Sequence, residues 1–130
     1  MDYEKSLEDL EKALFDLREE NKTIPIIVEG NKDIAALHKL DIIGEIIRLN
    51  QGMSIPDFCD MIAQKYKSII LLTDWDRKGG YLCSTIKKYL GGLVNCNTRY
   101  REIFAKRSMI RTLEGLPSWI QTLKQKIRAM

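Results

Sequence analysis

The segment Ile69-Ile70-Leu71-Leu72-Thr73-Asp74-Trp75-Asp76-Arg77-Lys78-Gly79-Gly80 decides the fold class, because it joins an apolar run directly to two aspartates and a pair of glycines. Its β-branched and aliphatic residues predict a strand over 68–73 that is buried on both faces. Asp74 and Asp76 then stand at the carboxyl end of that strand, where open α/β sheets bind their ligands. Gly79 lets the backbone turn tightly into a following helix, whose N-terminal N–H groups can meet a phosphate.

A second acidic turn ends an earlier apolar run, IIVEG at residues 26–30. A strand is expected over 23–29, so Glu29 lies at its carboxyl end and Gly30 permits the turn that follows. Asp33 falls three residues further on, in the first turn of the next expected helix. Acids gathered at one sheet edge repel one another unless a cation compensates them. The two turns therefore indicate a divalent-metal site and phosphate chemistry.

Strands and helices alternate along the whole chain, which predicts an α/β fold with a mostly parallel sheet of about four strands, covered on both faces. The expected strands are 23–29, 45–50, 68–73 and 93–96, and the expected helices are 3–21, 31–40, 55–66, 80–89, 100–107 and one from about 117. The leucine stripe of the first helix serves either to dock a partner or to pack on its own domain. No repeat or linker interrupts the pattern.

The composition is that of an ordinary globular protein, with 130 residues, 45% hydrophobic and 30% charged, and a formal net charge of +3. The charge is uneven, because residues 97–130 are basic; they predict either affinity for a polyanion or a solvated helix face. The sequence has no signal peptide and no apolar run of roughly 18 residues, so we expect a cytoplasmic protein without a membrane partner. Cys59, Cys83 and Cys96 lie far apart and are expected to be reduced thiols, the first two on buried helix faces.

The spacing of Asp74 and Asp76 suits a single metal ion, because residues i and i+2 of an extended strand end point the same way. Hard oxygen ligands favour Mg²⁺, with Mn²⁺ as the other candidate, and the lack of nearby histidine and cysteine ligands argues against zinc. Glu29 can hold the cation or exchange a proton beside it. Arg77 and Lys78 either contact a phosphate or neutralise the acids.

Three further side chains have competing interpretations. Asp33 either joins the acidic site or stabilises the N-terminus of its helix through the helix dipole. Trp75 either stacks on a base or packs against a helix. The single histidine, His38, has no second histidine or serine to work with, so a surface position is expected in preference to catalysis.

The string IIVEGNKDIAAL, followed by IILLTDWDRKG, resembles the Toprim domain, a family that includes topoisomerases, bacterial primases and a ribosomal-RNA maturase. The similarity is greatest to small stand-alone archaeal Toprim proteins and covers roughly residues 20–125. It implies a three-layer α/β/α, Rossmann-like Toprim fold. The implied organisation is a single Toprim domain over 1–130, with an N-terminal helix (1–22), a core that holds both acidic motifs (23–96) and a basic helical C-terminal part (97–130).

The resemblance also implies roles for the acidic turns. Glu29 matches the proposed general acid/base of the family, and Asp74 and Asp76 match its Mg²⁺ ligands. The supporting positions are Gly30, Asp33 and Gly79. The chain departs from many topoisomerases at Lys78 and Gly80, which stand where those proteins carry a further acid, so a two-metal cleavage mechanism is less strongly implied. No nucleophilic-tyrosine domain is present, and topoisomerase chemistry is not expected.

The sequence thus predicts a Mg²⁺-dependent nucleic-acid-processing protein with nuclease-like phosphodiester chemistry on RNA or DNA, in which Arg77, Lys78 and Arg99 bind the backbone. The alternative is a Mg²⁺-dependent nucleic-acid- or nucleotide-binding module without turnover, in an assembly with RNA- or DNA-processing proteins. A phosphatase with Asp74 as its nucleophile fits less well, because no threonine follows the two aspartates closely and Glu29 would have no role.

Overall fold

Four short parallel strands form the centre of the protein, as a computed structural model that describes residues 1–130 shows. The strands are β1 (Ile26–Val28), β2 (Ile46–Arg48), β3 (Ser68–Leu71) and β4 (Asn95–Asn97). Their order across the sheet is β2-β1-β3-β4, so the chain leaves β1 in one direction to reach β2 and leaves β3 in the opposite direction to reach β4. Ile27 pairs with Ile47 on one side and with Leu71 on the other. The sheet confirms the predicted α/β class and its strand number.

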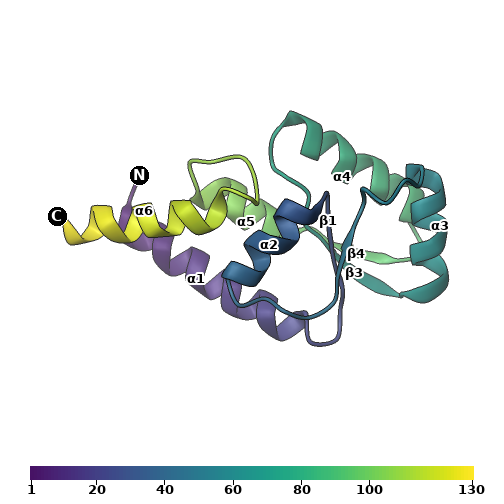
Figure 1. Ribbon diagram of the computed structural model, residues 1–130, viewed down its shortest axis with the longest axis horizontal. Coiled ribbons are helices and arrows are strands. Elements are labelled where there is room, and N and C mark those ends of the chain that lie inside the picture. Colours follow the sequence, from purple (N-terminus) through teal and green to yellow (C-terminus); the bar gives the residue numbers. More distant parts are fainter.

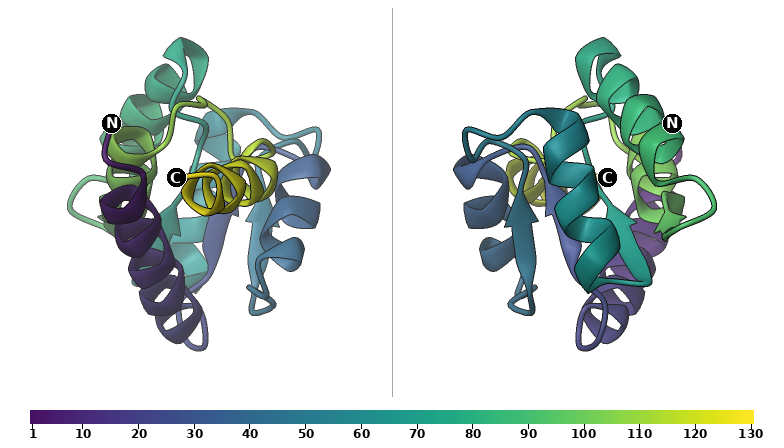
Figure 2. Two further views of the ribbon diagram at one scale, coloured as in Figure 1. Left: turned by 90° about the vertical axis from the view of Figure 1, so that its left-hand side faces the viewer. Right: turned by 90° about the vertical axis from the view of Figure 1, so that its right-hand side faces the viewer.

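Helices cover both faces of this sheet and make three layers (Figures 1 and 2). The helices are α1 (Tyr3–Glu20), α2 (Asn31–Lys39), α3 (Ile55–Lys65), α4 (Arg77–Leu90), α5 (Arg99–Arg107) and α6 (Leu116–Arg128). The strand residues Ile27 and Leu71 pack with α3 and α4 in one apolar cluster. Their neighbours Val28 and Ile70 point to the opposite face and pack with α1, α2, α5 and α6.

The leucine stripe of α1 is part of the core. Leu10 and Leu17 are fully buried and pack in the same cluster as Phe104 of α5 and Leu123 of α6. The stripe therefore packs on the protein itself, which decides between its two interpretations. Cys59 and Cys83 are buried free thiols, as predicted.

The starts of β1 and α4 differ most from expectation, and local hydrogen bonding explains both differences. β1 begins at Ile26, since Pro25 has no N–H to give to a ladder, whereas a strand from residue 23 was expected. α4 begins at Arg77, three residues before the expected start, because the Asp76 side chain caps it. The glycine pair consequently lies inside the first turn of the helix. None of the helices combines the length and the apolar composition needed to cross a membrane.

Candidate metal and phosphate site

The two acidic turns meet at the carboxyl edge of the sheet. Glu29 directly follows β1 and Asp74 lies three residues beyond β3, and these two strands are hydrogen-bonded neighbours. The carboxylate oxygen Oε2 of Glu29 accepts a hydrogen bond of 2.9 Å from the backbone N–H of Asp74. The connection after β1 runs to one side of the sheet and the connection after β3 runs to the other. The crevice between the ends of two such strands is the usual ligand position in open α/β sheets.

Asp76 shapes the second turn as the N-cap of α4. Its Oδ1 accepts a 2.7 Å hydrogen bond from the N–H of Gly79. The buried hydroxyl of Thr73 donates to the carbonyl oxygen of Gly79 at 2.8 Å, which ties the helix back to the end of the strand. Arg77 and Lys78 occupy the exposed first turn, where the helix has no acidic residue of its own. The turn thus presents backbone N–H groups and two cations beside Asp76.

Asp33 stabilises the start of its helix, which is one of its two interpretations. Its Oδ2 accepts a 3.0 Å hydrogen bond from the N–H of Gly30, which fixes the start of α2. Asp33 is only 7% exposed, and burial raises the pKa of its carboxyl above the usual range. The charge of Glu114 raises it further, against hydrogen bonds from Gly30 and Glu29 that lower it. The charge of Asp33 also acts on Asp74, so with Glu29, Asp74 and Asp76 it forms the acidic group at this edge, and its part in function stays a prediction.

Asp74 is the most perturbed acid of the group. Burial raises the pKa of its carboxyl to about 6, and the charges of Glu29, Asp33 and Asp76 act in the same direction. A hydrogen bond from the N–H of Leu113 to Asp74 Oδ1, 2.8 Å long, opposes the rise. Asp74 therefore lies within electrostatic reach of the other three carboxylates.

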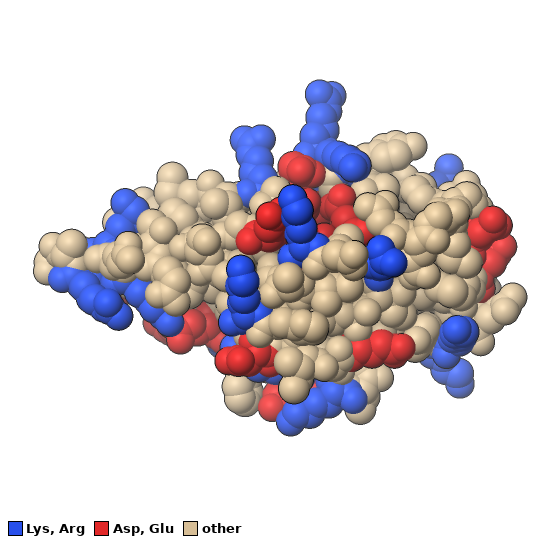
Figure 3. All heavy atoms as spheres, viewed as in Figure 1, with Lys and Arg blue, Asp and Glu red and all other residues tan.

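The acidic group lacks any compensating ion pair within the protein. Glu29, Asp33, Asp74 and Asp76 take part in none of its four salt bridges. Figure 3 shows acidic side chains gathered over the region where β1 ends and α2 begins, with Lys and Arg side chains around them. Uncompensated carboxylates of this kind are the setting in which a bound cation lowers the free energy most.

The donor set fits Mg²⁺ better than a metal that needs a closed cage. No three His, Cys, Asp or Glu side chains converge closely enough to form a preformed metal group. Mg²⁺ does not require one, because it keeps several waters and binds through one or two carboxylates. Glu29, Asp74 and Asp76 each direct one oxygen to a backbone N–H and leave the other without a hydrogen-bond partner. Asp74 and Asp76 are the residues that could hold the ion, with Glu29 beside them.

Arg101 is a site residue that the sequence analysis did not identify. Its Nε donates to the carbonyl oxygens of Thr73 and Asp74 at 3.2 Å each, and its Nη2 donates to Asp74 O at 2.9 Å. These carbonyls follow the last residue of β3, so a guanidinium from α5 satisfies backbone acceptors that the sheet leaves free. No local pattern distinguishes this arginine from its neighbours in the basic C-terminal part.

The segment 110–114 also supports the site and was not anticipated. Besides the bond from Leu113 to Asp74, the carbonyl of Arg111 accepts from the N–H of Trp75 at 3.0 Å. The indole N–H of Trp75 donates to Ile110 O at 2.6 Å, and its ring lies 5.9 Å from that of Phe104. Trp75 is therefore half-buried and packs against α5 and the segment 110–114, which favours the packing interpretation.

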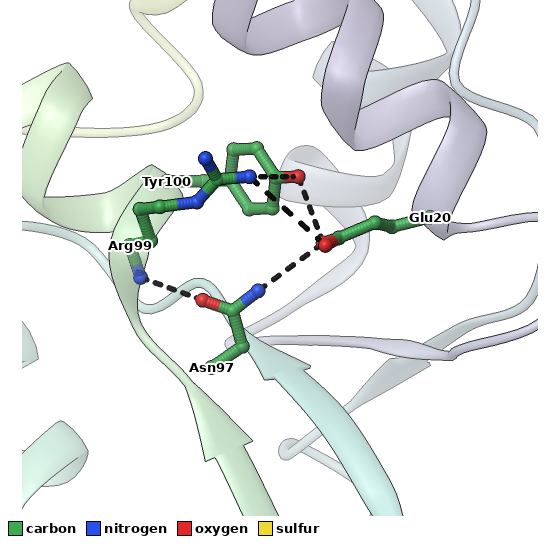
Figure 4. A network of polar contacts seen from close by, with 4 residues as sticks. All are labelled: Glu20, Asn97, Arg99 and Tyr100. Carbon is green, nitrogen blue, oxygen red and sulfur yellow. Dashed lines mark hydrogen bonds and ion pairs between the residues drawn. The ribbon is translucent and has the colours of Figure 1, made fainter.

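Arg99 contacts Tyr100 and Glu20 and makes no hydrogen bond with the acidic turns, although the sequence predicts that it binds phosphate together with Arg77 and Lys78. It belongs to a polar network that joins the end of α1 to the start of α5 (Figure 4). Its Nη2 donates to the Tyr100 hydroxyl at 2.9 Å and lies 4.0 Å from Glu20 Oε1, while Asn97 Oδ1 accepts from its backbone N–H. Its contact with nucleic acid stays a prediction. His38 is exposed on α2, as expected.

The fold agrees with comparisons to known proteins. The Toprim domain model matches residues 24–106. A UPF0292 protein of Thermoplasma volcanium is 45% identical over 102 residues, covering 78% of this chain and 86% of that protein. A UPF0292 protein of Methanosarcina acetivorans is 33% identical over 130 residues, covering 95% and 88%. A solved structure of a protein from Aquifex aeolicus matches with a TM-score of 0.68 and 27% identity, over 79% of this chain and 94% of that one.

The chain belongs to the Toprim domain family, as its sequence motifs predicted. Its relatives include small archaeal proteins that share the name UPF0292. Toprim domains generally bind Mg²⁺ through acidic residues and act on nucleic acids.

The raised pKa of Asp74 gives a first prediction, for the metal-free protein. Because the folded-state pKa of about 6 exceeds the usual aspartate pKa of 3.8, the folded protein binds more protons than the unfolded chain between these values. Its stability therefore falls as the pH rises through this window and levels off above it. The Asp74→Asn variant has no carboxyl to titrate there, so it does not lose this stability. Its Oδ1 can still accept the hydrogen bond from the N–H of Leu113. We expect it to raise the free energy of unfolding at pH 8 by roughly 1 kcal/mol, after a reduction for partial exposure.

Urea unfolding in EDTA, at pH 4 and pH 8, measures this difference between the variant and the wild type. Asp60→Asn, on the exposed surface of α3, is the matched control and should follow the wild type at both pH values. Equal stability differences for Asp74→Asn at pH 4 and pH 8 would contradict the prediction.

Proposed function

We propose that this protein is a Mg²⁺-dependent nucleic-acid-processing Toprim protein that carries out nuclease-like phosphodiester chemistry on RNA or DNA. Glu29 is the proposed general acid/base, and Asp74 and Asp76 are the proposed metal ligands. The observation that carries the proposal is the hydrogen bond from Asp74 N–H to Glu29 Oε2. It holds a proton-exchanging group at the junction of β1 and β3, next to the two carboxylates that suit a metal.

Each residue of the site has a separate task in this mechanism. A bound Mg²⁺ would neutralise charge on the phosphate and polarise it. The free oxygen of Glu29 takes a proton from the attacking oxygen or returns one to the leaving oxygen. Arg77, Lys78 and the first N–H groups of α4 bind the phosphate. Arg101 and Leu113 hold the backbone and the carboxylate of Asp74 in place.

A binding module without turnover is the second candidate, in an assembly with RNA- or DNA-processing proteins. Lys78 and Gly80 stand where many related enzymes carry another acid, which favours this candidate. Glu114, from a different part of the chain, is a further acid near the group, because its charge raises the pKa of Asp33. Metal binding is common to both candidates, and cleavage distinguishes them.

The metal site is tested by Asp76→Asn and Asp74→Asn. Asparagine is as good an N-cap as aspartate, so Asp76→Asn keeps α4 intact and removes only the charge. We expect each variant to weaken Mg²⁺ binding at least tenfold, which corresponds to about 1.4 kcal/mol. Isothermal titration with Mg²⁺, and with Mn²⁺ as the alternative ion, measures the affinity. The same variants should lose the Mg²⁺-dependent part of their affinity for labelled RNA and DNA.

Asp57→Asn is the matched control for these titrations. Asp57 also lies in the first turn of a helix, α3, and its side chain makes no hydrogen bond with the acidic turns. It should bind Mg²⁺ as the wild type does. Unchanged Mg²⁺ affinity in both Asp74→Asn and Asp76→Asn would contradict the proposed metal ligands.

A further inference from the structure

A cavity of about 200 Å³ opens directly beside Glu29. It lies between the loop that follows β2, the first turns of α3 and the start of α4. Its walls include Glu29 and Lys78 together with the apolar side chains Leu49, Met53, Phe58 and Leu82. Most of the wall is apolar, which differs sharply from the acidic turns next to it.

Two residues belong to this cavity and to the acidic site at once. Glu29 lines the cavity while its Oε2 is bonded to Asp74 N–H. Lys78 lines it from the first turn of α4, two residues after Asp76. A ligand whose phosphate lies at the acidic turns therefore has an apolar recess immediately beside that phosphate.

Asn50 supplies the polar group of the recess. Its backbone N–H donates to the carbonyl oxygen of Glu29 at 3.1 Å, which fixes the loop against the end of β1. Its side-chain amide also lines the cavity and makes no hydrogen bond within the protein. An amide offers both a donor and an acceptor, the pair of groups that recognises the edge of a base.

We propose that this cavity binds one unpaired nucleobase of the nucleic acid whose phosphate lies at the acidic turns. The proposal rests on the proposed function and specifies its substrate as single-stranded. The base is the flat, least polar part of a nucleotide, and apolar walls with one hydrogen-bonding group suit it. The volume is below the roughly 300–1,000 Å³ of pockets for drug-sized ligands, so it accommodates a single ring system and no base pair. A base inside a duplex is stacked and cannot enter.

The test compares two labelled single strands of equal length in Mg²⁺, one with bases and one abasic throughout. The wild type should bind the strand with bases at least about tenfold more tightly, a difference of roughly 1.4 kcal/mol. Leu82→Trp fills the cavity and should weaken the binding of the strand with bases alone. The affinities for the two strands should therefore become similar. Asn50→Ala, on an exposed loop where folding is not at risk, should reduce the same ratio several-fold.

Leu93→Trp is the matched control, because Leu93 is 68% exposed and lies outside the cavity. It should keep the wild-type ratio. Equal Mg²⁺-dependent affinity of the wild type for both strands would overturn the base pocket and leave the proposed function standing. Absence of Mg²⁺-dependent binding to either strand would contradict the proposed function itself. Retention of the full ratio by both Leu82→Trp and Asn50→Ala would also overturn the pocket.

Discussion

Gly79→Ala is expected to lower the free energy of unfolding by roughly 3 kcal/mol or more. A Cβ at this position would overlap the carbonyl oxygen of Asp74 and lie 2.5 Å from its carbonyl carbon. These are backbone atoms, so no side-chain rotation relieves the overlap. The second acidic turn would have to move away from α4. This movement would disrupt the hydrogen bonds that join Asp74 to Glu29 and to Leu113.

Gly80→Ala is the matched control for this substitution. The nearest heavy atom to a Cβ at Gly80 is Arg101 Nη2 at 3.5 Å, an ordinary contact with a flexible side chain. Because Gly80 lies inside α4, alanine should leave the stability unchanged or raise it by up to about 1 kcal/mol. Urea unfolding midpoints measure both effects. Equal midpoints for the two variants would show that the turn does not depend on this close approach.

Glu29→Gln is expected to reduce Mg²⁺-dependent cleavage by about 10²–10⁴-fold, the usual contribution of a general acid or base. The side-chain oxygen of glutamine can still accept the hydrogen bond from Asp74 N–H, so the turn should keep its shape. The amide cannot exchange a proton near neutral pH. Binding of labelled RNA and DNA should therefore persist while cleavage is lost. Gel assays with single-stranded and structured substrates measure cleavage, and fluorescence anisotropy measures binding.

Glu45→Gln is the control, because Glu45 precedes β2 at the amino end of the sheet and bonds to Tyr66. It should cleave like the wild type. If Glu29→Gln cleaves at the wild-type rate, Glu29 is not the general acid/base. If the wild type binds these nucleic acids in Mg²⁺ and cleaves none of them, the binding-module alternative holds instead.

The fold could be predicted from local patterns because each strand and helix follows from the residues within it. The apolar run before Asp74 is buried on both faces of the sheet, as a parallel strand requires. The order of strands and helices then restricts how the sheet can be connected. The sequence predicts the start of α4 three residues too late, because its glycine pair indicates a turn. In the structure Asp76 caps the helix, which therefore begins before the glycines.

The sequence by itself determined the α/β class, the Toprim motifs and the two acids that meet at one edge, Glu29 and Asp74. These follow from hydrophobic runs that end in carboxylates, a signal contained in neighbouring residues. Only the tertiary structure decided which distant groups support them. Arg101 contacts the backbone carbonyl of Asp74, and Leu113 donates to its carboxylate. Arg101 and Leu113 lie 27 and 39 residues after Asp74 in the sequence. Their positions at the site therefore depend on how α5 and the segment 110–114 pack on the sheet, and no local pattern encodes that packing.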